Sequence, residues 1–353
     1  MHLIDQQLNL MIRGRFEEGW KLAEELEALD PNDSRAKFNR GWFLINQGKL
    51  QEGFQCLEHG RALKVYGSGK INTTKPIWDQ SDLKGKTVIL NMECGFGDQI
   101  IYARFATEIW KRGGTCIMCC EKSLHPLFLR IPGVKECITL DEVSKTPHDF
   151  WIPGFSASWL FGHDFDTLPN DPYIFAKHES IDLWKSMLNT KKIKVGIRWS
   201  GSPLFEHQQF RIFPAKKLID LHKDFSHIQF YSLQRDTDII ELPDKVSDLQ
   251  HLIISWEDTA ACIANLDLVI TSCTSIAHLA SAMGKPTWVI VPLLPYHIWA
   301  YGGDHSPWYQ NTTKVFRQTK FGNWTDTFQQ VSDELNQLFP QKTKKQKAEK
   351  MSV

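Results

Sequence analysis

The chain has 353 residues, of which 42% are hydrophobic and 12% aromatic, and its 41 lysines and arginines equal its 41 aspartates and glutamates. This length predicts two or three domains with substantial cores. The balanced charge excludes a global field of the kind that draws a protein to nucleic acid or to an anionic membrane.

Compartment and redox state follow from the same composition. No run approaches the roughly 18 apolar residues that span a bilayer, and the first residues lack the apolar core of a signal peptide. We therefore expect a cytoplasmic protein. The eight cysteines mostly lie in apolar runs, so we interpret them as structural thiols, including Cys116, Cys119 and Cys120. Residues 341–353 form a lysine-rich tail that we expect to be disordered.

A repeat of 34 residues opens the chain. The segment GRFEEGW, which begins at Gly14, recurs as GKLQEGF from Gly48, and Leu10 maps onto Leu44 by the same offset. This period and its small and aromatic positions are typical of the tetratricopeptide repeat, in which each unit is a pair of antiparallel helices. Residues 1–70 are thus predicted to form a helical module. Two units bury little surface alone, so the module should pack on the rest of the protein, on a partner or on a second copy.

An α/β pattern begins after a linker at residues 67–85. Apolar runs predict strands at residues 87–92, 115–120, 136–140 and 149–152, and helical periodicity covers residues 99–112. The alternation indicates a parallel sheet covered by helices. We assign residues 71–178 to this first domain.

A second α/β pattern follows the break at residues 169–172. Its expected strands are 194–199, 229–233, 266–270 and 287–291, and its expected helices are 181–188, 214–222, 256–264, 274–283 and 324–338. We assign residues 179–340 to this second domain. Two open parallel sheets place a cleft between the carboxyl ends of their strands, where ligands usually bind.

Hydroxyl-bearing side chains mark the place where the strand ending at residue 270 gives way to a helix. They belong to Thr271, Ser272, Thr274 and Ser275. A helix start offers unpaired N–H groups and a positive dipole end, which together favour anions. The sequence therefore predicts a pyrophosphate site and a nucleotide-linked substrate.

Several short motifs, taken in order, resemble one family over nearly the whole chain to about residue 339. They are Trp78-Asp79, residues 85–87, 93–100 and 199–203, Arg211, and residues 232–234, 271–286, 292–299 and 306–309. The chain is similar to tetratricopeptide-repeat glycosyltransferases related to the heptosyltransferases of lipopolysaccharide synthesis. This resemblance implies a GT-B architecture of two Rossmann-like domains. The acceptor would lie toward the first, the nucleotide-sugar donor would lie in the second, and no catalytic metal would be used.

One position departs from the family pattern. Members usually carry aspartate where this chain has Cys273, so a carboxylate near the phosphate or ribose is missing. The departure leaves the donor, and activity itself, open.

The predicted acceptor side is the loop that follows the first strand. Asp98 comes after two glycines and before a helix, and the resemblance gives it the role of general base. The alternative is a simple helix N-cap. Gly95 and Gly97 are expected to let an acceptor approach the backbone.

The predicted donor side groups residues of the second domain. Thr274, Ser275 and His278 would bind the phosphates or ribose, and Arg211 would stabilise the departing diphosphate. The alternatives are ordinary capping for the two hydroxyls, a buried structural role for His278 and a surface position for Arg211.

Three further residues complete the predicted donor set: Trp199 and Gly201 in the loop before Arg211, and Gln234 after the strand at residues 229–233. The alternative for Gln234 is a loop amide without a ligand. His207 is a weaker candidate. Asp164 and Asp166 match the DxD pattern of metal-dependent sugar transferases, as do Asp236 and Asp238, but the place of the first pair at a domain end disfavours a metal site.

The sequence thus predicts a glycosyltransferase that moves a sugar from a nucleotide-sugar to an acceptor hydroxyl with inversion and without a metal or other cofactor. Two alternatives stay open. One is a catalytically inactive adaptor or binding protein with the same fold, and the other is transfer onto modified nucleic acid. The acceptor could be a glycan, a protein or a nucleic acid.

Overall fold

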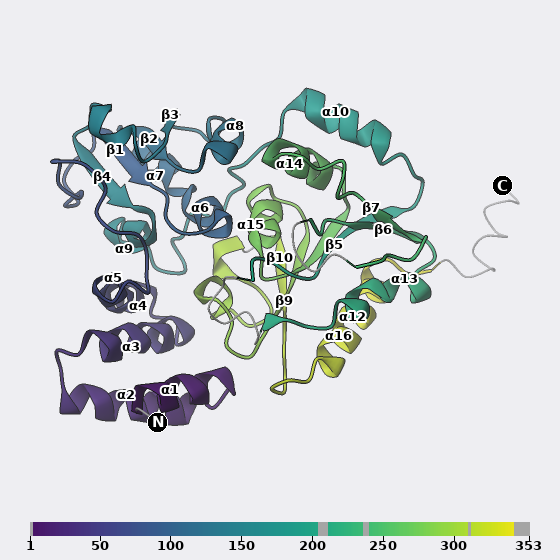
Figure 1. Cartoon of the computed structure of the whole chain (residues 1–353), viewed down its shortest axis with the longest axis horizontal. Helices are drawn as coiled ribbons and strands as arrows, with labels where there is room; N and C mark the ends of the chain where they lie inside the picture. Colours follow the sequence, from purple (N-terminus) through teal and green to yellow (C-terminus); the bar gives the residue numbers. More distant parts are fainter. Residues whose placement is uncertain (1–2, 204–210, 236–239, 310–311, 342–353) are drawn as a thin grey trace, which may run out of the picture.

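The computed structural model describes residues 3–203, 211–235, 240–309 and 312–341. It places a helical module beside two α/β units (Figure 1). The module contains α1 (Leu3–Ile12), α2 (Phe16–Leu29), α3 (Ser34–Asn46), α4 (Leu50–Leu57) and α5 (His59–Ala62). In Figure 1 it lies at the lower left, below the first unit.

The two halves of the repeat have matching turns. Gly14 and Gly48 both adopt left-handed backbone angles, with φ of 76° and 87°, and the helices after them begin at Phe16 and Leu50. Such angles suit glycine because it lacks a Cβ atom. The tetratricopeptide assignment itself remains a prediction. Ile45, Leu50, Phe54 and Leu57 are buried in the same core as side chains of the first α/β unit, so the module packs on the rest of the chain as expected.

The first α/β unit has a four-stranded parallel sheet in the order β3-β2-β1-β4. Its elements are β1 (Thr87–Asn91), α6 (Phe96–Tyr102), α7 (Phe105–Lys111), β2 (Thr115–Cys119), α8 (His125–Phe128), β3 (Val134–Ile138), β4 (Phe150–Pro153), the 3-10 turn η3 (Gly154–Ser156) and α9 (Ala157–Leu160). The central strands are almost wholly buried, which is why they read as continuous apolar runs.

The second α/β unit has a six-stranded parallel sheet in the order β10-β9-β8-β5-β6-β7. Its strands are β5 (Ile193–Arg198), β6 (Ile228–Ser232), β7 (Val246–Asp248), β8 (Leu268–Ser272), β9 (Thr287–Val291) and β10 (Thr313–Arg317). Its helices are α10 (His178–Met187), α12 (Ala215–Ile219), α13 (Leu221–Asp224), α14 (Trp256–Ala264), α15 (Ser275–Ala282) and α16 (Thr325–Leu338), with 3-10 turns η4 (His297–Trp299) and η5 (Pro307–Tyr309). An α/β fold with two parallel sheets is therefore confirmed.

The helix expected at residues 99–112 is wrong, because the structure divides this stretch into α6 and α7. The carbonyl of Ile101 accepts a bond from the Arg104 guanidinium at 2.9 Å, and that of Ile100 accepts one from the Tyr173 hydroxyl at 2.9 Å. These side chains take carbonyls of the last turn of α6. The backbone between the two helices then continues through hydrogen bonds that join residues three apart instead of four, such as that from the Ala106 N–H to the Ala103 carbonyl.

The two α/β units share one apolar core. That core includes Leu90 of β1, Val269 of β8 and Ile276 of α15. Arg104 is 1% exposed, and its guanidinium donates to the Pro169 carbonyl of its own unit at 2.9 Å and, across the boundary, to the Trp308 carbonyl of the second unit at 2.7 Å. The units are thus joined by packed interior.

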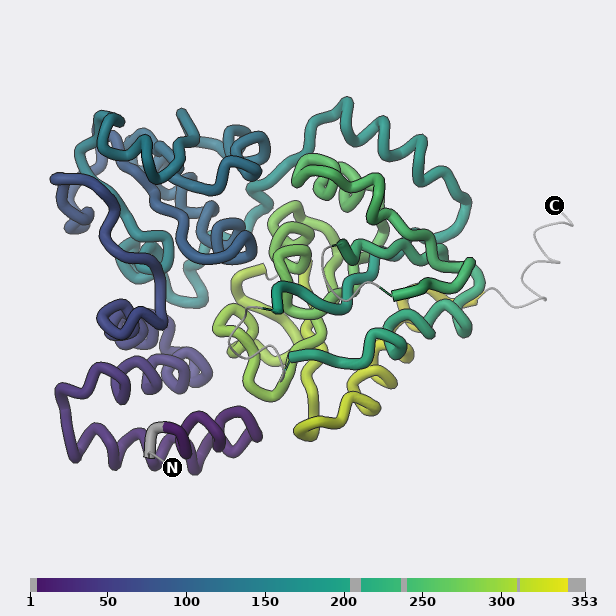
Figure 2. The backbone as a smooth tube through the Cα atoms, viewed as in Figure 1, coloured from purple at the N-terminus to yellow at the C-terminus, as the bar shows by residue number. Residues whose placement is uncertain are grey.

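Helix α6 of the first unit crosses α15 of the second where their backbones run side by side (Figure 2). A Cβ atom at Gly97 would lie 3.2 Å from the His278 ring and 3.5 Å from the Ser275 Cα atom. A glycine at this point allows that close approach. In the part of the chain that the structure describes, no helix is long and apolar enough to cross a membrane.

Candidate functional site

A cavity of about 1540 Å³ lies where the two units and the helical module meet. Its walls come from the segments after β1, β5, β8 and β9 and from faces of α1 and α3. Strand order reverses between β1 and β4 in the first sheet and between β5 and β8 in the second. Ligands of open α/β sheets bind at such reversals, beyond the carboxyl ends of the strands. The topology therefore places this cavity at the expected binding position of both sheets.

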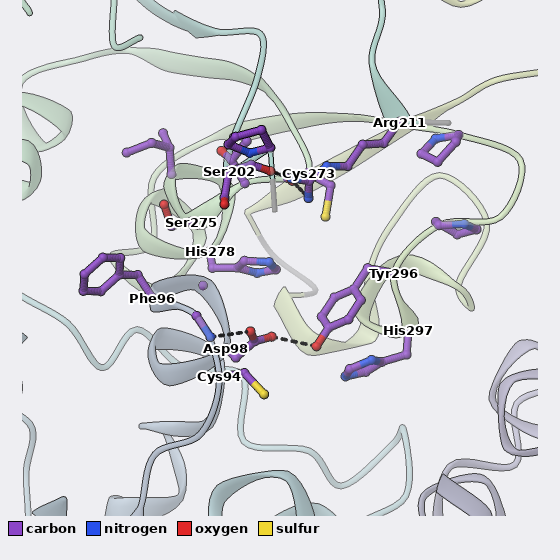
Figure 3. A pocket seen from close by; sticks show the side chains of 18 of the residues that line it. Cys94, Phe96, Asp98, Ser202, Arg211, Cys273, Ser275, His278, Tyr296 and His297 are labelled. Atoms are coloured by element: carbon purple, nitrogen blue, oxygen red, sulfur yellow. Dashed lines mark hydrogen bonds between the residues drawn. The ribbon is translucent and has the colours of Figure 1, made fainter. Parts of the chain in front are cut away.

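Asp98 lies on the first turn of α6 and lines this cavity (Figure 3). Its Oδ2 accepts the Gly95 backbone N–H at 3.1 Å, and its Oδ1 accepts the Tyr296 hydroxyl at 2.6 Å. Gly95 is the N-cap, so the alternative of Asp98 as the N-cap is wrong, although its carboxylate does satisfy an N–H group of the helix start. Burial raises the pKa of the Asp98 carboxyl to about 6, against the opposing effect of the Tyr296 hydrogen bond. A carboxylate with such a pKa can take up a proton near neutral pH.

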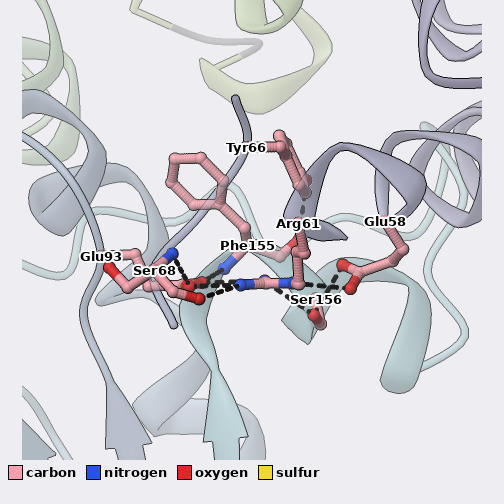
Figure 4. Close-up of polar contacts among 7 residues, drawn as sticks. All are labelled: Glu58, Arg61, Tyr66, Ser68, Glu93, Phe155 and Ser156. Atoms are coloured by element: carbon pink, nitrogen blue, oxygen red, sulfur yellow. Dashed lines mark hydrogen bonds and ion pairs between the residues drawn. The ribbon is translucent and has the colours of Figure 1, made fainter. Parts of the chain in front are cut away.

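The loop before Asp98 is anchored to the helical module. Glu93 follows β1 and is 2% exposed. Its carboxylate accepts bonds from the Arg61 guanidinium at 2.5 and 3.0 Å and from the backbone N–H groups of Ser68 and Phe155 (Figure 4). Arg61 also pairs with Glu58 at 2.7 Å. Because every contact of the Glu93 carboxylate is charge-assisted, this network holds the beginning of the Asp98 loop firmly against α5 and η3.

The turn between β8 and α15 forms the wall of the cavity where the sequence predicts the donor. Thr274 is the N-cap of α15 and makes no side-chain capping bond; its hydroxyl instead lies 3.2 Å from that of Thr271. Thr271 and Ser272 belong to β8 and are buried, so of the four predicted hydroxyls it is those of Thr274 and Ser275 that line the cavity. The Thr274 side chain therefore does not cap α15. The first turn of this helix borders the cavity.

Arg211 reaches the same wall from the segment after β5. One Nη atom donates to the Cys273 carbonyl at 3.0 Å and the other to the Ser202 carbonyl at 3.2 Å. The side chain lines the cavity beside Gly201, and burial lowers the pKa of its guanidinium. Arg211 is half-buried, and its guanidinium places a cation next to the start of α15.

His278 lies in the cavity, as predicted for a donor-binding residue, but it is also buried, as expected for the alternative structural role. It lines the cavity but is 3% exposed, and its ring stacks on Trp299 at 5.0 Å and lies 3.3 Å from the Tyr309 hydroxyl. Burial lowers its pKa to about 3, so the imidazole stays neutral. A neutral ring can exchange hydrogen bonds with a ligand but carries no charge for a phosphate.

Two predicted donor residues do not reach the cavity. Trp199 is buried in the core of the second unit. Gln234 is 2% exposed, and its amide binds the backbone N–H groups of Trp199 and Ser200 and the Ser200 hydroxyl. These contacts correct the prediction that Gln234 touches the nucleotide, because its polar atoms already fix the loop after β5.

The glycines of the acceptor loop also differ in part from their predicted role. Gly95 and Gly97 both line the cavity, but the space at Gly97 is taken by Ser275 and His278 of α15. The missing side chain at Gly97 thus serves the contact between the two units.

Several weaker candidates lie elsewhere. Asp164 is exposed, and its carboxylate accepts the N–H of the next residue at 3.0 Å. His207, the Asp236–Asp238 pair and tail residues 342–353 lie outside the described residues. Within the described ranges, no three His, Cys, Asp or Glu side chains come together as a possible metal site.

Sequence reasoning missed two cavity residues that touch each other. Tyr296 follows β9 and bonds Asp98, and its ring lies 6.2 Å from that of Trp42 on α3. Tyr296 belongs to the family motif at residues 292–299, but no local pattern shows that it meets a residue as far away in sequence as Trp42 or Asp98. The structure explains in part why cysteine, and not the family's usual aspartate, stands at position 273. The buried Cys273 thiol accepts the Trp299 indole N–H at 3.1 Å.

Comparison with solved structures identifies the fold. The ADP-heptose lipopolysaccharide heptosyltransferase II of E. coli superposes with a TM-score of 0.52 and 13% identity, over 71% of this chain and 98% of the other. A glycosyl transferase family 9 structure from Veillonella parvula DSM 2008 gives a TM-score of 0.52 and 14% identity, over 75% and 92%. The chain therefore has the two-sheet α/β fold of these enzymes. At such identities the likeness is one of fold.

Among curated proteins, the chain is similar to FlbA of Caulobacter vibrioides, with 22% identity over 330 residues. The match covers 85% of this chain and 54% of FlbA, so the chain spans about half the length of that relative. No protein-family model matches the sequence.

Proposed function

We propose that this chain is a glycosyltransferase of GT-B type that moves a sugar from a nucleotide-sugar to an acceptor hydroxyl. One observation carries the proposal: a single cavity brings together a carboxylate from the first unit and a cationic, hydroxyl-rich helix start from the second. The fold shared with heptosyltransferase II supports the same class.

The acceptor side supplies the base. Asp98 takes the proton of the acceptor hydroxyl as its oxygen forms a bond to the anomeric carbon. A base with a pKa near 6 is ionised at neutral pH yet still able to accept a proton. Attack from the side opposite the leaving group inverts the anomeric carbon.

The donor side stabilises the leaving group. As the bond between the anomeric carbon and phosphate oxygen breaks, its electron pair goes to the nucleoside diphosphate. Arg211, the hydroxyls of Thr274 and Ser275 and the first turn of α15 stabilise the charge that develops there. On this proposal they replace a metal ion.

The helical module contributes to the acceptor side. Phe38, Asn39 and Trp42 lie on one face of α3 and line the cavity that holds Asp98. An acceptor that reaches Asp98 would therefore pass along this helix face. We propose that the module selects the acceptor, in addition to any partner that it binds.

Binding of the donor is the direct test. The protein is screened by thermal shift against ADP-heptose and UDP-, GDP-, CMP- and dTDP-sugars, and a ligand at 100 times its dissociation constant should stabilise it by about 2.7 kcal/mol. Transfer is then measured with the stabilising donor. If no nucleotide-sugar binds, the proposal is wrong.

Cys273 motivates one second candidate, a binding protein that has kept the cavity without turnover. Its thiol is neutral and already bonded to Trp299, and burial raises its pKa. Donor binding in the wild type without transfer or hydrolysis of the donor would favour this candidate over the enzyme.

A further inference from the structure

The Tyr296 hydroxyl bridges the two sides of the cavity. Tyr296 lies between β9 and η4 in the second unit, whereas the Asp98 carboxylate it bonds belongs to α6 of the first. Figure 3 shows the phenol pointing at the carboxylate, whose other oxygen is held by Gly95. One carboxylate oxygen is therefore fixed by its own helix start and the other by the opposite unit.

The ring of Tyr296 is itself fixed by two neighbours. Its centroid lies 4.1 Å from that of His297 and 6.2 Å from that of Trp42 on the helical module. The ring that carries the hydroxyl therefore contacts both the second unit and the helical module. A carboxylate oxygen has two acceptor positions, so an acceptor hydroxyl can donate to Asp98 while the Tyr296 bond persists.

We propose that Tyr296 is a positioning residue for sugar transfer: its hydroxyl orients the Asp98 carboxylate and keeps it ionised when the two units and the module are assembled. This inference rests on the function proposed above. A bond donated to the ionised form of an acid favours that form. Tyr296 thereby opposes the effect of burial, which raises the pKa of the Asp98 carboxyl.

Other titratable groups interact electrostatically with Asp98. They are Glu93 and Cys94 on its own loop, Tyr102 on α6, and Arg211 and Cys273 from the second unit. His278 also lines the cavity, and Glu58 and Arg61 lie behind Glu93. Replacing Tyr296 with phenylalanine changes none of them. A change in the titration of Asp98 would therefore report the lost hydrogen bond.

The test measures that titration in the free protein. Carboxyl carbons are labelled with 13C in aspartate, the Asp98 signal is assigned with Asp98→Asn, and its pKa is read by NMR. Tyr296→Phe should raise this pKa by about one pH unit, since a bond to a charged group is worth roughly that much. Tyr301→Phe is the matched control, because this tyrosine lies on the same segment, is 39% exposed and stacks on Phe165. An unchanged or lower pKa in Tyr296→Phe would overturn the inference.

Activity separates this inference from the proposed function. With ADP-heptose or whichever donor the screen identifies, the acid limb of kcat/KM for Tyr296→Phe should move up by the same amount. The variant would then be about tenfold slower than wild type at pH 5 and nearly equal at pH 8. An equal loss at every pH would overturn the role of Tyr296 in ionisation. If the NMR shift occurs but wild type transfers no sugar, the hydrogen-bond linkage stands and the proposed function fails.

Discussion

On the proposed function, the cavity has an acceptor wall around Asp98 and a donor wall around Arg211, and the two walls are held in different ways. Asp98 depends on Tyr296 from the second unit and, through Glu93, on Arg61 from the helical module. Arg211 is held by the carbonyls of Ser202 and Cys273, both in its own unit. The neighbouring loop is likewise fixed from within by Gln234.

This difference separates two properties of the protein. Donor binding should require the second unit alone, whereas Asp98, the proposed base, is held by contacts that three parts of the chain share. Variants of the acceptor wall should therefore change turnover, and variants of the donor wall should change affinity for the nucleotide.

The largest effect is expected for Asp98→Asn. Loss of a general base should lower kcat by about 10²–10⁴-fold, while the dissociation constant for ADP measured by calorimetry stays the same. Folding raises the pKa of Asp98 above its unfolded value, so the stability that this group contributes is present at low pH and lost as pH rises through about 6. The asparagine variant should thus be no less stable at pH 7.5. A large loss of ADP affinity would contradict the separation of the two walls.

Arg61→Met tests the link to the helical module. It leaves Glu93, whose side chain is 1% exposed, without its cation, and removal of one partner of a buried pair should cost about 3 kcal/mol of unfolding free energy. Denaturant titration measures this loss of unfolding free energy. In kinetic assays, the fold decrease in kcat should exceed the fold decrease in affinity for the donor. The control is Arg15→Met, since Arg15 and its partner Glu18 are 54% and 56% exposed and their pair should contribute nothing measurable. Equal effects of the two variants would show that the Glu93 network does not hold the loop.

Arg211→Met should weaken ADP binding by about 10–100-fold, because bonds from a cation to phosphate oxygens are lost. Isothermal calorimetry with ADP measures the change. Lys122→Met, an exposed cation at the cavity edge, is the matched control and should bind ADP as wild type does. A similar loss in both variants would indicate that general charge, and not this site, attracts the nucleotide.

The smallest expected effect is the pH dependence of the wild type. Protonation removes the base, so kcat/KM should fall about tenfold per pH unit below pH 6 and level off above it. His278 should add no limb in this range, since its pKa is lowered to about 3. Measurement between pH 4.5 and 8 decides this. A profile that stays flat down to pH 5 would argue against Asp98 as the base.

Much of the fold could be predicted from local pattern. The strands at residues 87–91 and 287–291 and the helix at residues 256–264 lie where their apolar periodicity places them. The strands β7 and β10 escaped prediction because the first is three residues long and the second, at the sheet edge, carries Lys314 and Arg317. At the break between α6 and α7, the Tyr173 hydroxyl binds the Ile100 carbonyl. Helical periodicity cannot predict this contact, because the two residues lie far apart in the sequence.

Much of the site could be predicted from the sequence, because Asp98, Arg211, Thr274, Ser275 and His278 all line one cavity. A place next to a strand end was not sufficient, since Trp199 and Gln234 follow strands and do not line it. The burial of the Gln234 and His278 side chains could not be predicted from the sequence. Because of it, Gln234 binds the loop after β5 and the His278 ring is neutral. The contact between Asp98 and Tyr296 spans 198 residues and follows from tertiary packing alone.

The common interior of the two α/β units constrains how this chain can change during evolution. Gly97 fits against α15, and the buried guanidinium of Arg104 is matched to carbonyls of Pro169 and Trp308. Recombination that exchanged one unit for that of another protein would break the contact of Gly97 with α15 and that of Arg104 with Trp308 at once. New substrate preferences are therefore expected to arise by point substitution in the loops around the cavity, and engineering by domain shuffling should fail where loop grafting succeeds.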